Sequence, residues 1–165
     1  MKALTWPRPL LLLPVLLLAL ALLAAACGGG EEKGAVKGTA TKEAEEGELF
    51  VDPNAPVVEV SLTEFKVEPR TDTGTAGPLT FSASNDGAIE HELVIIKTDT
   101  PVDKLPVASG KVDEDAAGKV VDEIKEFEAG KTVAATFDLA AGKYALICNI
   151  AGHYQAGMHA GFTVK

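Results

Sequence analysis

The chain has 165 residues, of which 47% are hydrophobic, and its 24 acidic against 15 basic side chains give a formal net charge of −9 at pH 7. The part of the chain that follows residue 55, about 110 residues, is adequate for one hydrophobic core but not for two domains. The acidic balance argues against a nucleic-acid-binding protein and against direct adhesion to anionic membranes, and it is compatible with steering toward a basic partner protein.

The first 26 residues have the composition of a secretory signal peptide. Lys2 and Arg8 give a positively charged start, residues 10–23 are apolar apart from one proline, and alanines 24–26 precede the expected cleavage point. The apolar run is short for a membrane span, which argues against an uncleaved anchor. We therefore expect an exported protein that faces the periplasm or the cell exterior. Cleavage leaves 13 basic against 24 acidic side chains, a net charge of −11.

Cys27 directly follows the alanines, which predicts a bacterial lipoprotein whose lipidated cysteine attaches it to a membrane. The alternative is ordinary cleavage after Ala26, which leaves a soluble protein with a free Cys27. Residues 28–55 are rich in Gly, Glu, Lys, Ala and Thr and cannot bury enough apolar surface to fold. We expect residues 27–55 to be a lipidated cysteine and a flexible tether. A disulfide from Cys27 to Cys148 is not expected, because it would tie this tether to the C-terminal segment that carries the candidate functional residues.

Residues 56–165 are predicted to form one all-β domain. Apolar and polar residues alternate over short runs, as in half-buried strands, and turn-forming residues separate the runs. A loop with a short helix near residues 102–105 is expected within 100–118. Seven short strands fit one Greek-key antiparallel β-sandwich. The predicted strands lie within residues 58–65, 79–83, 89–97, 120–127, 132–139, 143–148 and 161–164.

The C-terminal part of this domain contains a thiol, an imidazole and a thioether at equal spacing. Four residues separate Cys148 from His153, and four separate His153 from Met158. A thiolate, two imidazoles and a weak, distant thioether are the ligand set of a blue-copper electron-transfer site. The second imidazole must come from elsewhere, and His91 is the only histidine far away in sequence. His159 adjoins Met158 and competes as a ligand, but we expect it to be exposed near the edge of the site.

These features resemble the cupredoxins, the blue-copper family that includes plastocyanin, azurin, auracyanin and rusticyanin. The resemblance covers about residues 57–165, and it is carried by the strand 142–148, the loop 148–158 and His91. The loop spacing is closest to that of auracyanin and rusticyanin. The resemblance implies a one-electron carrier with one type 1 copper that cycles between Cu(I) and Cu(II). The implied metal ligands are His91, Cys148, His153 and Met158.

The main functional hypothesis is thus an exported, monomeric electron carrier that serves redox partner proteins, with no enzymatic activity and no nucleic-acid partner. The alternative is a copper delivery or buffering module that uses the same ligands and exchanges its metal easily. Many cupredoxins have Asn after the first histidine, where this chain has Glu92. Glu92 either adjusts the potential through its charge or points into solvent, and we expect the latter. Asn85 and Asn149 are candidates for hydrogen bonds around the metal ligands.

Overall fold

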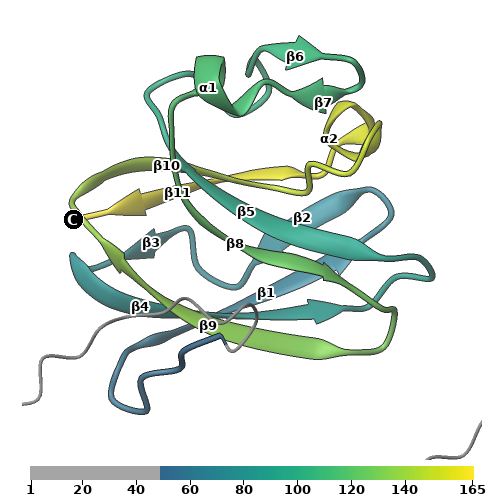
Figure 1. The fold of residues 1–165 in the computed structure, drawn as a ribbon. Helices are drawn as coiled ribbons and strands as arrows, with labels where there is room; N and C mark the ends of the chain where they lie inside the picture. The colour runs from purple at the N-terminus through teal and green to yellow at the C-terminus, as the bar shows by residue number, and fades with distance from the viewer. Residues whose placement is uncertain (1–48) are drawn as a thin grey trace, which may run out of the picture. The chain divides into compact units, whose positions relative to one another are not determined.

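The computed structural model describes residues 49–165, which form two packed β-sheets (Figure 1). The predictions for the signal peptide, for Cys27 and for most of the tether lie outside the described residues. Within residues 49–165, no helix is long and apolar enough to cross a membrane.

The first sheet has four strands in the order β2-β1-β4-β9. Its strands are β1 (Val57–Thr63), β2 (Lys66–Pro69), β4 (Gly77–Asn85) and β9 (Thr132–Leu139). In β1 every second residue is buried, which follows the alternation seen in the sequence. β1 runs antiparallel to β2 but parallel to β4, with Val57 opposite Thr80.

The second sheet has five strands in the order β3-β11-β10-β5-β8. Its strands are β3 (Thr73–Gly74), β5 (His91–Lys97), β8 (Lys119–Phe127), β10 (Gly142–Ile147) and β11 (His159–Val164). The neighbours β11, β10, β5 and β8 pair antiparallel, whereas β3 lies parallel to β11.

The predicted all-β sandwich is confirmed, and all seven predicted strands are present. Two features of these two sheets differ from the prediction. The short strands β2 and β3 were not predicted, because two to four residues are too few to show a period. The β1–β4 and β3–β11 pairs are parallel rather than antiparallel, which their connections allow because neither pair is joined by a direct hairpin.

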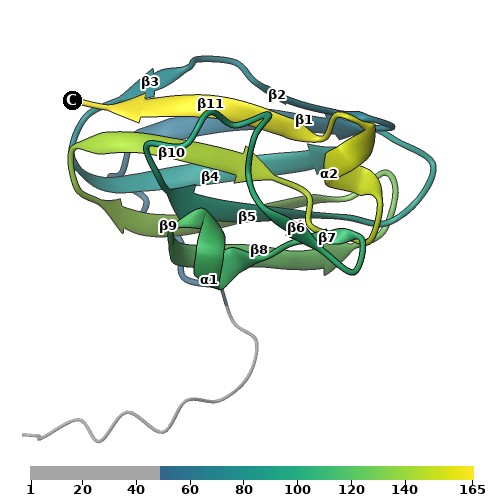
Figure 2. The same cartoon turned by 90° about the horizontal axis from the view of Figure 1, so that it is seen from above.

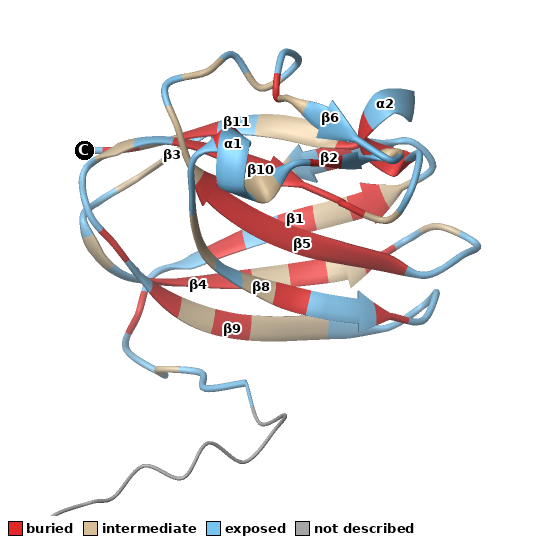
Figure 3. Ribbon diagram, turned by 45° about the horizontal axis from the view of Figure 1, so that its top comes forward, coloured by how far each residue is buried: buried red, intermediate tan, exposed pale blue. Residues whose placement is uncertain are grey.

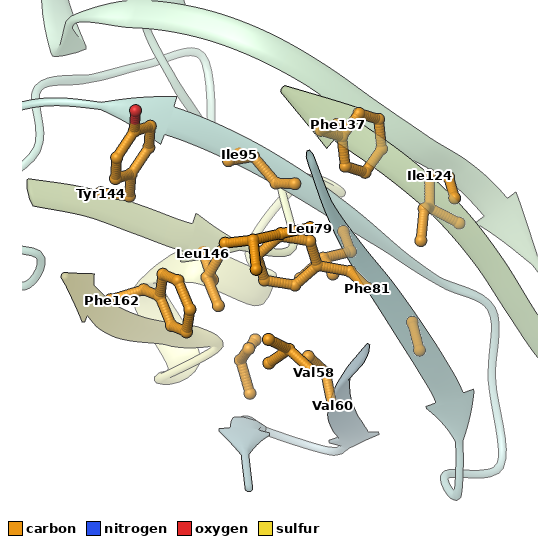
Figure 4. Close-up of a cluster of buried hydrophobic side chains, with 14 of the residues drawn as sticks. Val58, Val60, Leu79, Phe81, Ile95, Ile124, Phe137, Tyr144, Leu146 and Phe162 are labelled. Carbon is orange, nitrogen blue, oxygen red and sulfur yellow. The ribbon is translucent and has the colours of Figure 1, made fainter. Parts of the chain in front are cut away.

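The core lies between the two sheets and is filled by side chains from both (Figure 4). Phe81 on β4 and Phe162 on β11 meet across it edge to face, with ring centroids 5.4 Å apart. Such a pair adds about 1 kcal/mol to the stability gained by burial alone. Phe137 on β9 packs against Phe81 from the same sheet.

A long connection between β5 and β8 covers the outer face of the second sheet (Figures 2 and 3). It contains the hairpin β6 (Val107–Ala108) and β7 (Lys111–Val112) and the short helix α1 (Glu114–Ala117). The helix predicted near residues 102–105 is absent there, and the helical turn lies at α1, where the Asp113 side chain caps it. Because of this cover, β5 is buried on both faces.

Candidate metal centre

A thiol and two imidazoles lie at one end of the sandwich, positioned by two neighbouring strands and a short helix. His91 is the first residue of β5, and Cys148 directly follows the last residue of β10. β10 and β5 are antiparallel neighbours, so the end of one lies beside the start of the other. His153 is the first residue of α2 (His153–Ala156), which lies next to the end of β10 (Figure 2).

The thiol and both imidazoles face one another. The Cys148 Sγ atom lies 3.3 Å from His153 Nδ1 and 3.9 Å from His91 Nδ1. The ligand atoms of all three residues lie within 4.8 Å of one another, and all three residues are buried. Metal bonds of about 2.3 Å to sulfur and about 2.1 Å to nitrogen place such donors roughly 3 to 4 Å apart. The observed separations therefore fit donors that share one metal ion.

Met158 is held at the same end of the domain by its backbone. Its N–H donates to the His153 carbonyl and its carbonyl accepts from the Cys148 N–H, both at 3.1 Å. Its side chain is fully buried in the same hydrophobic cluster as Cys148. The backbone of Met158 is therefore tied directly to that of Cys148 and of His153.

The surroundings of His91 favour metal binding over proton binding at its imidazole. Burial, and next the neighbouring His153, lower the pKa of His91, so its imidazole is neutral near pH 7, as a ligand must be. Burial raises the pKa of the Cys148 thiol, which the backbone N–H groups of Glu92 and Ile150 partly oppose. A bound cation favours the thiolate directly. The donor set of thiolate, two imidazoles and thioether is that of one type 1 copper site.

Glu92 is buried rather than solvent-exposed, and the expectation that it points into solvent is wrong. Only 8% of its surface is accessible, because the second sheet is covered on its outer face. Burial raises the pKa of its carboxyl, while a hydrogen bond from the Asn149 backbone acts in the opposite direction.

Both predicted asparagines make hydrogen bonds next to the ligands. Asn149 Oδ1 accepts from the Val112 N–H at 2.6 Å, and its Nδ2 donates to the Val112 carbonyl at 3.2 Å and to Glu114 Oε1 at 2.8 Å. Asn85 Nδ2 donates to the carbonyls of Ile89 and Phe127 at 2.8 and 3.0 Å. Asn149 fixes the loop after Cys148, and Asn85 shapes the turn that leads into His91.

The sequence did not single out Tyr154, which connects the same loop to the covering segment. Its hydroxyl donates to the Val102 carbonyl at 2.8 Å and accepts from the Leu105 N–H at 2.9 Å. His159 is half-buried, packs against the Tyr154 ring at 5.2 Å and does not belong to the three-residue cluster. The rings of Phe65 and His153 also pack edge to face, with their centroids 5.9 Å apart.

Comparison with known proteins agrees with this geometry. Residues 75–165, more than half of the chain, match the model of the sulfocyanin (SoxE) domain. Among curated proteins, no sequence matches significantly.

Several solved structures share the fold. Dithionite-reduced auracyanin from Roseiflexus castenholzii has a TM-score of 0.53 at 22% identity and covers 67% of this chain and 98% of its own. Auracyanin B has a TM-score of 0.52 at 21% identity, with 71% and 94% covered. Reduced rusticyanin has a TM-score of 0.51 at 21% identity, with 66% and 76% covered. At these identities the likeness shows the cupredoxin fold, and the match over residues 75–165 shows that the chain belongs to the sulfocyanin (SoxE) domain family.

Proposed function

We propose that this protein binds one copper ion through His91, Cys148, His153 and Met158 and transfers single electrons between redox partner proteins. The observation that carries the proposal is the buried cluster in which the Cys148 sulfur faces Nδ1 of both histidines. When bound, copper supplies a one-electron couple between Cu(I) and Cu(II).

Each of the four residues has a chemical task in this proposal. Cys148 provides the strong thiolate donor, His91 and His153 provide neutral imidazoles, and Met158 provides the weak thioether that helps to set the potential. Four protein donors leave no position for a substrate, which supports an electron carrier rather than an enzyme. His91 and Cys148 lie on paired strands, so the donors are held in place and need little rearrangement on electron transfer.

His153 marks the side of the site from which electrons would enter and leave. It is 8% exposed, whereas His91, Cys148 and Met158 have no accessible surface. In the proposed setting the protein is exported and monomeric, and a lipid on Cys27 and the residues after it would attach the domain to a membrane. The acidic net charge of −9 favours partners with a basic docking surface.

The test is the visible spectrum of the purified protein with Cu(II), together with Cys148→Ser and, as the matched thiol control, Cys27→Ser. We expect an intense blue thiolate-to-copper band with reversible reduction in the unchanged protein and in Cys27→Ser, and no such band in Cys148→Ser. A colourless Cu(I) complex that readily gives up its metal to a chelator would support the delivery or buffering alternative. Absence of copper binding would contradict both functions.

A further inference from the structure

The ring nitrogen of His91 that faces away from the thiol lies next to a carboxylate. Its Nδ1 atom faces Cys148 Sγ, while its Nε2 atom lies 3.4 Å from Oε1 of Glu64. Among residues 49–165, this Nε2 is the one buried side-chain polar atom that has no hydrogen bond of standard geometry. An unpaired buried N–H is destabilising, because it has given up its hydrogen bonds to water. Glu64 is the carboxylate that the described residues place within reach of it.

Glu64 is itself fixed in this position by the backbone. It follows the last residue of β1, and its Oε1 accepts the N–H groups of Ala88 at 2.8 Å and of Ile89 at 3.0 Å. These two residues belong to the turn that leads into His91. The hydrogen bond from Ala88 is the first of several contacts that lower the pKa of Glu64, so the group is a carboxylate at neutral pH. Oε1 of Glu64 therefore both anchors the turn at residues 88 and 89 and faces the imidazole of His91.

Gly87 leaves room for this contact. A Cβ atom at position 87 would lie 2.6 Å from Glu64 Oε1 and 2.9 Å from His91 Nε2, closer than such atoms approach in proteins. Any larger residue there would force the carboxylate and the imidazole apart. The absence of a side chain at position 87 thus belongs to the same arrangement as Glu64 and His91.

We propose that Glu64 is a positioning residue of the metal centre: its carboxylate accepts a hydrogen bond from Nε2–H of His91, directs the Nδ1 lone pair toward the metal, and favours Cu(II) over Cu(I). A neutral imidazole carries one ring proton, and an acceptor at Nε2 keeps that proton there and leaves Nδ1 free to bind a metal. The negative charge also favours the more highly charged oxidation state. The inference rests on the proposed copper function, which it deepens.

The competing interpretation is that Glu64 only anchors the turn at residues 88 and 89. That role concerns stability alone and leaves both the ring tautomer of His91 and the redox equilibrium unchanged. The two interpretations therefore differ in what happens when the charge is removed but the side-chain shape is kept. Glu64→Gln makes this change. Glu90→Gln is the matched control, because it removes an exposed carboxylate from the same turn, next to His91 in sequence.

The first measurement is the reduction potential of the copper-loaded wild-type protein and of both variants. In Glu64→Gln we expect the preference for Cu(II) over Cu(I) to fall about 10-fold, which corresponds to the lower end of the effects that residues holding a metal-binding histidine have on metal affinity. For a one-electron couple this raises the potential by about 59 mV. Glu90→Gln should leave the potential close to that of the wild-type protein, since within residues 49–165 the carboxylate in contact with His91 is that of Glu64. Equal potentials in Glu64→Gln and Glu90→Gln would overturn the inference.

The second measurement needs no copper. Nitrogen-15 NMR of the copper-free wild-type protein should show His91 protonated at Nε2 and unprotonated at Nδ1, and Glu64→Ala should weaken this preference. A wild-type His91 protonated at Nδ1 overturns the inference even where Glu64→Gln does not fold. Failure of the copper function has a different signature, which is absence of the blue band in the wild-type protein whatever the tautomer of His91.

Discussion

Asn149 offers a sharp test of how the metal-binding loop is held. The residue directly follows Cys148, is 5% exposed, and connects the loop to the segment that covers the second sheet. Its side chain makes three hydrogen bonds: it accepts from the Val112 N–H and donates to the Val112 carbonyl and to Glu114 Oε1. Asn149→Ala removes all three and leaves the N–H of buried Val112 without its partner.

The structure sets the size of the effect. The hydrogen bond to the Val112 carbonyl contributes about 1 kcal/mol, and leaving the buried Val112 N–H unpaired costs about 1–3 kcal/mol. The bond to Glu114 adds little, because this side chain is partly exposed. We therefore expect Asn149→Ala to lower the free energy of unfolding by roughly 2–4 kcal/mol. That is a large part of the 5–15 kcal/mol or so typical of a domain.

Urea unfolding of the copper-free protein measures this change without the contribution of the metal. The midpoint should fall in Asn149→Ala while the slope of the transition stays the same. Asn54→Ala is the control, because Asn54 is exposed and bonds only to nearby Asp52. It should change stability by less than about 0.5 kcal/mol. An Asn149→Ala protein as stable as Asn54→Ala would refute the role assigned to this side chain.

Two further changes probe the same end of the domain. Tyr154→Phe removes the hydroxyl that accepts from the buried Leu105 N–H, so unfolding with urea should show a loss of about 1–3 kcal/mol, and the blue band should keep its position. Burial lowers the pKa of His91, so below pH 6.5 the unfolded chain binds this proton more readily than the folded one. The free energy of unfolding of the copper-free protein should therefore decrease as pH falls from about 6.5, by at most about 1.4 kcal/mol per pH unit. An equally steep decrease in His91→Asn would contradict this assignment.

The strands of the core could be predicted because their pattern is local. In β1, Val58, Val60 and Leu62 are buried and alternate with more exposed residues, as the sequence indicates. The direction of strand pairing could not be predicted, since an alternating strand looks the same in a parallel and in an antiparallel pair. The continuous apolar run Leu93–Ile96 carries further information about the fold. Such a run indicates a strand buried on both faces, and therefore a segment that covers the sheet.

The candidate metal ligands could be proposed from the sequence for a different reason. Cys148, His153 and Met158 lie within one short loop, so their spacing is visible in the sequence, and His91 followed because few histidines were available. Glu64 could not be found in this way. It carries no motif, and its link to His91 depends on the turn between β4 and β5 folding back beside the end of β1. Contacts of this kind need three-dimensional placement.

The connection between β1 and β2 contacts both imidazoles of the candidate metal centre. Glu64 faces Nε2 of His91 at 3.4 Å, and the next residue, Phe65, places its ring against His153 at 5.9 Å. Both residues precede residue 75, where the match to the sulfocyanin domain begins. The carboxylate acts on the buried histidine through charge and hydrogen bonding, whereas the ring, itself 44% exposed, shields the more accessible histidine from water. The strands that carry the ligands therefore determine which donor atoms face one another. Glu64 and Phe65, which lie outside the matched region, are placed to adjust the charge and the hydration of the site.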